Sequence, residues 1–354
     1  MPTEQEILEA LKQVEDPDLH RDIVSLGFVD SINIQDKRVS LRIVLTTPAC
    51  PVREEMKAQV EQVLLSLPGV QETDVTMDAN VRANQPTAGG KPIEGVRNLI
   101  AVASNKGGVG KTTVAVNLAV ALAKRGASVG LLDADVTGPN IPIMMGFEAG
   151  FMAEGEGSGL STVEKYGVRM VSLGFVLPKL SPVVWRGPMV GTAVRQLLHD
   201  IKWGELDYLI VDLPPGTSDA SMSMAQEAPI SGVVIVSTPA DVAWEDASKA
   251  VAMFDKLNVP VFGVIENMSY FICPHCDERT EIFGHGGGRT AADELGLEFL
   301  GEIPLDMKTR VGADTGVPVV ESDEDSPQAQ AFIRVAEQVA ARCSTLQFAT
   351  AGVE

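Results

Sequence analysis

Short runs of apolar residues alternate with longer amphipathic stretches over most of the chain. Continuous apolar runs of strand length indicate strands that are buried on both faces, and helical periodicity between them indicates helices that cover a parallel sheet. From Leu99 onward the predicted strands are Leu99–Ala103, Ser128–Asp133, Met170–Leu173, Tyr208–Asp212, Gly232–Ser237 and Val261–Glu266. We therefore expect residues 99–354 to form an α/β domain with a mostly parallel sheet, whose ligands bind at the carboxyl ends of the strands.

Residues 1–79 show a different pattern, in which helices and strands are mixed without the regular alternation. The segment 3–14 has helical periodicity, and Thr3 with Glu6 three positions later forms a capping-box signature. The other predicted elements are a strand at Arg38–Leu45, a helix at Pro51–Leu67 and a short strand at Val75–Met77. This order predicts a small α+β domain ahead of the α/β domain.

Residues 80–98 lack periodicity and are rich in Pro, Gly, Asn and Thr, which is typical of a linker. Near the other end, Ser326 and Pro327 provide an N-cap and a first helical residue for the last clear helix. We expect that helix to end near Arg342, with a short tail after it.

The chain has 354 residues, a formal net charge of −20 and a pI of about 4.6. A general nucleic-acid binder needs a basic face, and docking on anionic lipids needs one too, so we expect neither nucleic acid nor membrane as a partner. The acidic residues are spread along the chain, which indicates a solvated acidic surface. One hypothesis is a high-salt cytoplasm, where screening removes the self-repulsion of such a surface.

No apolar run approaches the roughly 20 residues that span a bilayer, and the polar, acidic first fifteen residues show no signal-peptide pattern. A cytoplasmic protein is therefore expected. Four cysteines in a chain of this length do not make a disulfide framework, so in a reducing cytosol they are candidate ligands, nucleophiles or bystanders.

A glycine-rich turn at residues 106–113 lies between the predicted strand Leu99–Ala103 and a helical pattern at Thr112–Lys124. It fits the phosphate-loop pattern G-x-x-x-x-G-K-[ST] except that Asn105 stands where the first glycine belongs. Backbone N–H groups and the helix N-terminus would hold an anion here, Lys111 would reach its terminal phosphates, and Thr112 would bind Mg²⁺. The residues of this turn expected to bind nucleotide are Gly107, Gly108, Gly110, Lys111, Thr112 and Thr113.

Acidic side chains follow two of the other predicted strands. Asp133 and Asp135 come at the end of one, where they would hold Mg²⁺ or orient an attacking water. Asp212 ends the predicted strand Tyr208–Asp212, in the manner of a Walker B aspartate, and a stiff loop with two prolines follows at 213–219. That loop is suited to sensing a terminal phosphate.

Cys273 and Cys276 form a C-x-x-C pair. This spacing places two thiolates on one side of a tight turn, where both can bind the same Zn²⁺ ion or iron–sulfur cluster. Only one such pair exists in the chain, so a symmetric dimer would bring four thiolates to a shared metal centre. A redox disulfide also uses this spacing, although the following residues do not begin a clear helix.

Residues 106–113 resemble the deviant Walker A loop of the P-loop group that includes Min- and Par-type ATPases and the nitrogenase iron protein. The resemblance implies that Lys106 reaches the phosphates of a partner chain in a nucleotide-bound dimer, as an arginine finger does. It also implies that Asp135 positions water beside Asp133, and that Asn267 hydrogen-bonds adenine.

The cysteine pair with the preceding residues 267–272, the loop 213–217 and the segments 138–142 and 186–188 resemble the Mrp/ApbC-type iron–sulfur cluster carrier ATPases over about residues 95–340. The resemblance implies a homodimer with ATP and Mg²⁺ and a [4Fe–4S] cluster held through Cys273 and Cys276, with His275 as a spacer. It further implies delivery of the cluster to apo iron–sulfur proteins.

The first domain resembles the small cluster-assembly domain often fused ahead of such ATPases, through residues 16–18, 26–29 and 46–51. A cluster-assembly scaffold is accordingly an expected partner. Cys50 precedes a proline at a helix start, where the helix dipole would lower its pKa, but a half-buried structural cysteine fits equally well. Cys343 is expected to be structural, and His20, His199 and His285 lack a partner at ligand spacing.

Three other functions remain open at this point. A Min/Par-type positioning switch would leave the cysteine pair without a role. A nitrogenase-reductase-like electron donor has its two cluster ligands far apart in sequence, unlike the pair here. A zinc-bridged dimeric ATPase would use the same four thiolates for a structural metal.

The acidic composition gives a first prediction. If the surface is adapted to high salt, the free energy of unfolding rises steeply between low and multimolar salt, because counterions screen the repulsion among carboxylates. Chemical denaturation at a series of salt concentrations measures this. A stability curve that is flat over that range would contradict the high-salt hypothesis.

Overall fold

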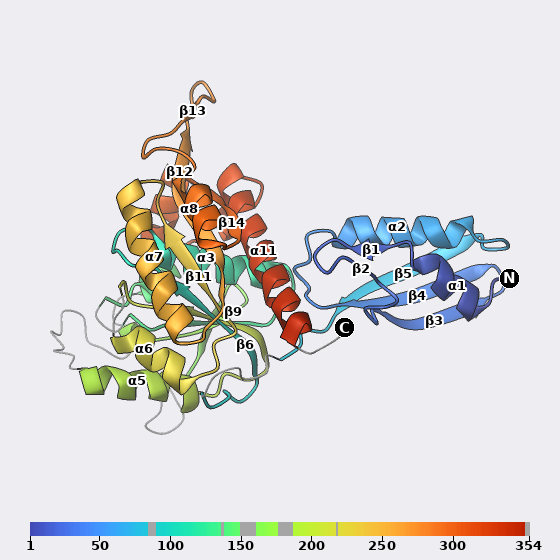
Figure 1. Ribbon diagram of the computed structural model, residues 1–354, viewed down its shortest axis with the longest axis horizontal. Coiled ribbons are helices and arrows are strands. Elements are labelled where there is room, and N and C mark those ends of the chain that lie inside the picture. Colours follow the sequence, from blue (N-terminus) through green and yellow to red (C-terminus); the bar gives the residue numbers. More distant parts are fainter. Residues whose placement is uncertain (84–89, 136–137, 149–160, 176–186, 217–218, 351–354) are drawn as a thin grey trace. The chain divides into compact units, whose positions relative to one another are not determined.

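The computed structural model describes residues 1–83, 90–135, 138–148, 161–175, 187–216 and 219–350. Part of the predicted linker, Thr217 and Ser218 of the two-proline loop, Arg186 and the last four residues lie outside these ranges. The chain divides into two compact units, one of Met1–Arg82 with the residues from Ala340 on, and one of Ala83–Val339 (Figure 1). None of the described helices has the length and apolar character that crossing a membrane requires.

The first unit is a three-stranded sheet with helices, in agreement with the predicted small α+β domain. Its middle strand pairs antiparallel with one neighbour and parallel with the other. The elements are α1 (Glu4–Leu11), β1 (Glu15–Asp16), β2 (Arg21–Asp22), β3 (Val29–Gln35), β4 (Arg38–Leu45), α2 (Arg53–Ser66) and β5 (Glu72–Ala79). The capping box predicted at Thr3 and Glu6 is present at the start of α1.

The outer face of this sheet is exposed and carries more acid than base. Arg38 lies 3.4 Å from Glu72 and 2.9 Å from Asp74. On the same strand, Arg42 lies 2.6 Å from Asp78. Each arginine is therefore surrounded by carboxylates, and the excess negative charge remains in solvent, where salt screens it.

The last helix is longer than predicted. α11 spans Pro327–Thr350 and does not end near Arg342. Its last turns, assigned from sequence to the domain at 99–354, group with the first unit. The physical reason is packing: Phe348 is 8% exposed within the first unit's apolar core, and the Arg82 guanidinium lies 4.4 Å from the centre of its ring. Tertiary contacts therefore extend the helix past its sequence signal.

The second unit is built on a large, mostly parallel sheet, as predicted. The described strands follow the order β13-β12-β11-β6-β10-β7-β9-β8, and β14 also pairs with β12. Pairing is parallel except at the two short strands β8 and β13. The strands are β6 (Val96–Ala103), β7 (Val129–Asp133), β8 (Val163–Lys165), β9 (Val168–Ser172), β10 (Leu206–Asp212), β11 (Gly232–Ser237), β12 (Val261–Ile272), β13 (Arg279–Thr280) and β14 (Phe299–Leu305).

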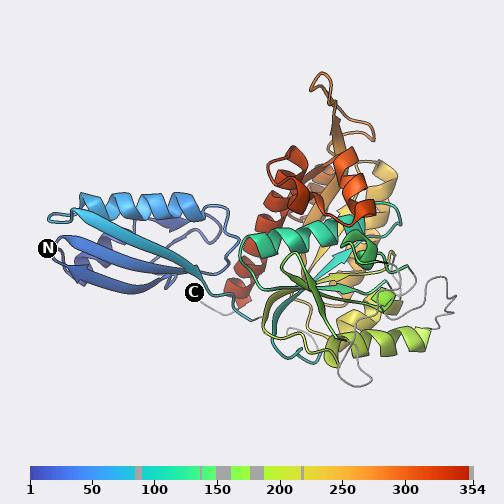
Figure 2. The ribbon, with the colours of Figure 1, turned by 180° about the vertical axis from the view of Figure 1, so that it is seen from behind.

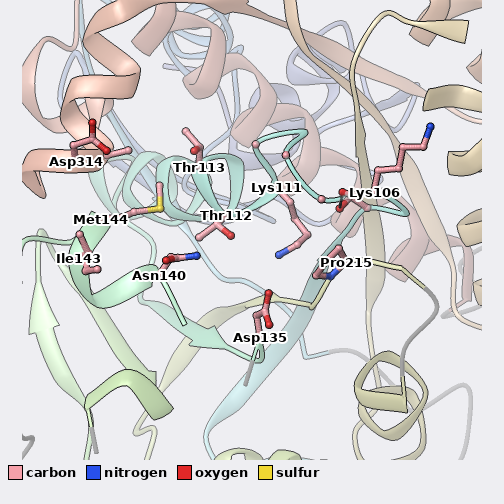
Figure 3. A pocket seen from close by; sticks show the side chains of 15 residues that line it. Lys106, Lys111, Thr112, Thr113, Asp135, Asn140, Ile143, Met144, Pro215 and Asp314 are labelled. Atoms are coloured by element: carbon pink, nitrogen blue, oxygen red, sulfur yellow. Dashed lines mark hydrogen bonds between the residues drawn. The ribbon is translucent and has the colours of Figure 1, made fainter. Parts of the chain in front are cut away.

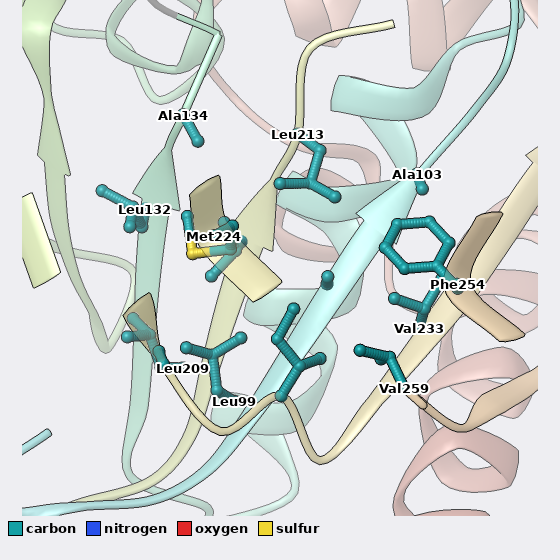
Figure 4. Packing of buried hydrophobic residues seen from close by; sticks show 14 of the residues in the cluster. Leu99, Ala103, Leu132, Ala134, Leu209, Leu213, Met224, Val233, Phe254 and Val259 are labelled. Atoms are coloured by element: carbon teal, nitrogen blue, oxygen red, sulfur yellow. The ribbon is translucent and has the colours of Figure 1, made fainter. Parts of the chain in front are cut away.

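Helices cover both faces of this sheet (Figures 1 and 2). The described ones are α3 (Lys111–Lys124), α4 (Ile141–Met144), α5 (Gly187–His199), α6 (Asp219–Glu227), α7 (Asp241–Lys256), α8 (Gly287–Leu295), α9 (Met307–Thr315), α10 (Val319–Ser322) and α11, with a 3₁₀ turn at Leu173–Phe175. Figure 4 shows one apolar layer, in which strand residues such as Leu99 and Leu209 pack with Met224 of α6 and Phe254 of α7. Alternate residues of the strands face the opposite layer, where α3 is buried along most of its length.

The sequence missed the edge of the sheet beyond β11. The sixth predicted strand ended at Glu266, whereas β12 continues to Ile272, and β14 was not predicted. Both misses have one cause, which is pairing between distant segments. The extension of β12 pairs with β13 and with β14, and β14 pairs with β12. The carboxyl ends of β6, β7 and β10 lie together, which brings the motifs that follow these strands to one edge of the sheet.

Candidate functional site

The glycine-rich turn joins the end of β6 to the start of α3, as the phosphate-loop pattern predicts. Gly108 and Gly110 have φ values of 82° and 81°, the left-handed conformation that glycine adopts without strain. A Cβ at Gly110 would overlap the side-chain amide of Asn267, which donates a 2.8 Å hydrogen bond to the Val109 carbonyl. The sequence signal for this turn was local, but the contact with Asn267 comes from the tertiary structure.

Asp212 holds the first two residues of α3. Its Oδ1 accepts a hydrogen bond from the Lys111 ammonium at 2.5 Å, and its Oδ2 accepts one from the Thr112 hydroxyl at 2.7 Å. Both Lys111 and Asp212 are buried, and burial raises the pKa of the Asp212 carboxyl while Lys111 opposes that rise. The ammonium, hydroxyl and carboxylate that the sequence assigned to phosphate and Mg²⁺ are thus brought together.

Asp133 ends β7 in a fully buried position. Its carboxylate accepts hydrogen bonds from the Ser172 hydroxyl at 3.0 Å and from the backbone N–H groups of Ile141 and Asp135. Burial, with the nearby charge of Asp212, raises the pKa of Asp133 to about 8. These hydrogen bonds hold the backbone at Asp135 and at the start of α4. In the structure Asp133 therefore positions the residues that follow β7.

A cavity of about 480 Å³ opens beside the turn (Figure 3). Of the predicted site residues, its lining includes Lys106, Asp135 and those of the turn from Gly107 to Thr113 apart from Val109, but not Asp133, Asp212 or Asn267. In Figure 3 the Lys111 side chain reaches toward the space near Asp135, while Lys106 extends away from Lys111. The rest of the lining is Ser104, Asn140, Ile143, Met144, Pro215, Ala313 and Asp314, of which only Asn140 and Pro215 belong to segments that the sequence had singled out.

A second cavity, of about 490 Å³, adjoins the first and shares Gly110, Thr113, Ala313 and Asp314 with it. Asn267 lies in its wall. The rest of the wall is largely apolar and comes from the end of β12, the segment after β13, the end of β14 and the start of α9: Met268, Phe271, Ile282, Pro304, Leu305, Asp306, Met307, Thr309 and Arg310. Because β14 was not predicted, this wall could not be expected from the sequence.

Cys273 and Cys276 lie in the turn between β12 and β13, which extend beyond the rest of the second unit (Figure 1). Cys273 is half-buried and Cys276 is exposed, and both are free thiols. The turn is closed by two backbone hydrogen bonds, Cys273 N–H to Glu278 and Asp277 N–H to Cys273. Backbone N–H of His275, with the Cys276 thiol, lowers the pKa of Cys273, which favours the thiolate that binds metal.

The described residues of one chain contain no group of three or more Cys, His, Asp or Glu side chains that could hold a metal ion. Two thiolates can supply at most two of the four ligands of a thiolate-bound metal centre. Cys343 is buried in α11, and burial raises its pKa to about 12, in keeping with the structural role expected from sequence.

Replacing Gly110 with alanine tests how tightly the turn is built. We expect Gly110→Ala to lower the free energy of unfolding of the nucleotide-free protein by more than about 1 kcal/mol, from the left-handed backbone and the overlap with Asn267. Gly107→Ala is the matched control, since a Cβ there meets nothing, and we expect a change within about 0.5 kcal/mol. Urea denaturation measures both, and equal stability of the two variants would contradict this account of the turn.

Two family models match the chain. One, described as a NUBPL iron-transfer P-loop NTPase, covers residues 95–340, and the other, described as an iron–sulfur cluster assembly protein, covers residues 4–77. An iron–sulfur cluster carrier protein of Synechocystis is 44% identical over 97% of this chain and 99% of its own length. The mouse iron–sulfur cluster transfer protein NUBPL is 50% identical over 71% of this chain and 79% of its own length.

Solved structures are similar to the second unit. A nucleotide-binding protein from Archaeoglobus fulgidus, in complex with ADP, is 40% identical, with a TM-score of 0.58 over 68% of this chain and 93% of its own. The cell-division ATPase MinD of Pyrococcus furiosus, 24% identical with a TM-score of 0.52 over 68% of this chain and 98% of its own, shares the fold. The chain belongs to the family of NUBPL-type iron-transfer P-loop NTPases and carries an N-terminal domain of the iron–sulfur cluster assembly family.

Proposed function

We propose that this protein carries a [4Fe–4S] cluster between two copies of the chain and transfers it to apo iron–sulfur proteins, with ATP binding and hydrolysis. The observation that carries the proposal is the placement of Cys273 and Cys276 at an exposed turn of a two-stranded extension. Two thiols per chain in an accessible turn suit a cargo that is shared by two chains and released, whereas a resident cofactor is usually enclosed.

The four ligands of the cluster would be Cys273 and Cys276 of each chain, and His275 would remain a spacer. The family match and the carrier names of full-length relatives support this assignment. Zinc also accepts four thiolates in tetrahedral geometry, so metal analysis distinguishes the carrier from a zinc-bridged ATPase.

The cavity beside the glycine-rich turn would bind the phosphates of ATP. Lys111 would contact the terminal phosphates, Thr112 and Asp212 would hold Mg²⁺, and Asp135 would position the attacking water. The adjoining apolar cavity would take the adenine ring next to Asn267. The 40% identical protein in complex with ADP supports nucleotide binding at this site.

Lys106 would act across the dimer. Within its own chain its side chain extends away from Lys111 (Figure 3), although Lys106 is among the residues that line the cavity. A cation that arrives from the partner offsets the charge that develops on the transferred phosphoryl group. The proposed homodimer would therefore serve both ATP hydrolysis and cluster binding. We also propose that the protein works in the cytoplasm and receives clusters from an assembly scaffold.

Metal analysis tests the cluster assignment. We expect protein purified without oxygen to contain about four iron and four acid-labile sulfide per dimer, with an iron–sulfur absorption band, because four thiolates hold one such cluster. The double variant Cys273→Ala/Cys276→Ala should lose both. His275→Ala, which keeps both thiols, is the matched control and should retain the cluster. Zinc in place of iron, or iron retained by the double variant, would contradict the assignment.

Two lysine variants test the roles in ATP hydrolysis. Lys111→Ala should abolish nucleotide binding, since it removes the cation that faces the phosphates. Lys106→Ala should keep nucleotide affinity within a few-fold but lower the rate of hydrolysis on the order of 10³-fold, the low end for a cation supplied in trans. Isothermal titration calorimetry and phosphate release measure the two quantities. Hydrolysis at the unmodified rate in Lys106→Ala would rule out the action across the dimer.

A further inference from the structure

A single strand connects the nucleotide cavity to the cysteine pair. In its middle, β12 carries Asn267, whose amide donates to the Val109 carbonyl of the glycine-rich turn at 2.8 Å. At its end, Ile272 pairs with Arg279 of β13 and is followed directly by Cys273. A change in β12 between Asn267 and Ile272 therefore reaches both sites.

The backbone of β12 is irregular in that interval. Asn267 pairs with Ile303 of β14, and the next pair is Phe271 with Leu305, so residues 268–270 of β12 lie opposite Pro304 alone. Proline has no N–H to offer a neighbouring strand, which favours a bulge at this point. Met268 has a φ of 56°, a left-handed conformation that is unfavourable for a residue with a Cβ. The bulge therefore holds local strain that a change in its surroundings can release.

The front of the bulge faces the second cavity. Met268 and Phe271 both line it, together with Asn267 and with Gly110 of the glycine-rich turn. A ring that fills this cavity therefore contacts Met268 of the bulge, five residues before Cys273, and Phe271, two residues before it. A nucleotide whose phosphates occupy the first cavity and whose base occupies the second would thus contact β12, the strand that leads to the thiols.

The back of the bulge is fixed by buried polar contacts. The Ser269 hydroxyl donates to Glu266 Oε1 at 2.6 Å, and Glu266 Oε2 accepts the backbone N–H of Gly288 at the start of α8. Ser269 and Glu266 are fully buried, and a Cβ at Gly288 would lie 2.8 Å from Glu266 Oε2. Because Ser269 and Glu266 are held against α8, the part of the bulge that can change conformation is the part that faces the cavity, where Met268 lies.

We propose that Met268 is the positioning residue through which nucleotide binding changes the exposure of Cys273 and Cys276. An occupied cavity favours one arrangement of the bulge and an empty cavity the other, and the end of β12 carries this difference to the turn between β12 and β13. The inference rests on the proposed nucleotide and cluster sites, and it supplies a physical connection between ATP binding and cluster release.

The test uses the full chain without metal, so that it does not depend on the cluster. The alkylation rate of the two thiols is followed by mass spectrometry of the peptide that contains Cys273 and Cys276, with and without saturating ADP or a non-hydrolysable ATP analogue. We expect nucleotide to change this rate at least about fivefold, the lower end of usual coupling between two sites. In Met268→Gly, which adopts the left-handed backbone freely and removes the side chain from the cavity, the ratio should approach one.

Two further variants sharpen the result. Asn258→Gly changes another left-handed residue of the same unit, outside β12, and should keep the unmodified ratio. Met268→Leu retains an apolar side chain in the cavity and should restore most of the coupling. No nucleotide effect in the unmodified chain, or a full effect in Met268→Gly at saturating nucleotide, would overturn the proposal. Absence of iron in the purified protein would instead refute the proposed cluster while leaving this measurement valid.

Discussion

The buried contact between Lys111 and Asp212 is the interaction on which the site depends. A buried ammonium is stable only with a charged or hydrogen-bonding partner, and Asp212 supplies it at the carboxyl end of β10. The same carboxylate holds Thr112, so it fixes the first two residues of α3 and with them the glycine-rich turn. The register of β10 between β6 and β7 places this carboxylate directly beside the turn and beside Asp133.

The two proposed sites differ in how they are built. The phosphate site is built from buried groups at the centre of a large parallel sheet, so its geometry is set by the core. The thiols lie on a narrow two-stranded extension with an exposed turn, held by a few backbone hydrogen bonds. Such an element changes conformation at low energetic cost. A carrier needs this combination, since it holds its cargo firmly in one state and releases it in another.

Much of the fold and site was predictable because the signals are local. The positions of the central strands along the chain follow from continuous apolar runs. The helix at Lys111–Lys124 follows from its glycine-rich start, and the α1 cap from Thr3 and Glu6. Parallel strands bring the motifs at their carboxyl ends to one edge, so the proximity of the glycine-rich turn and Asp212 also followed from the pattern. The roles of the individual site residues remain proposals.

The sequence by itself determined the features that depend on neighbouring residues alone: buried strands, a capped helix, a glycine-rich turn before a helix and the C-x-x-C spacing of two cysteines. Only the tertiary structure decided the features that depend on distant partners. The extension of β12 and the existence of β14 arise from mutual pairing, the bulge at Met268 from Pro304 opposite it, and the end of α11 from the burial of Phe348. The second cavity, whose wall comes from β12, β14 and α9, has no local signal for the same reason: its residues are brought together only by the fold.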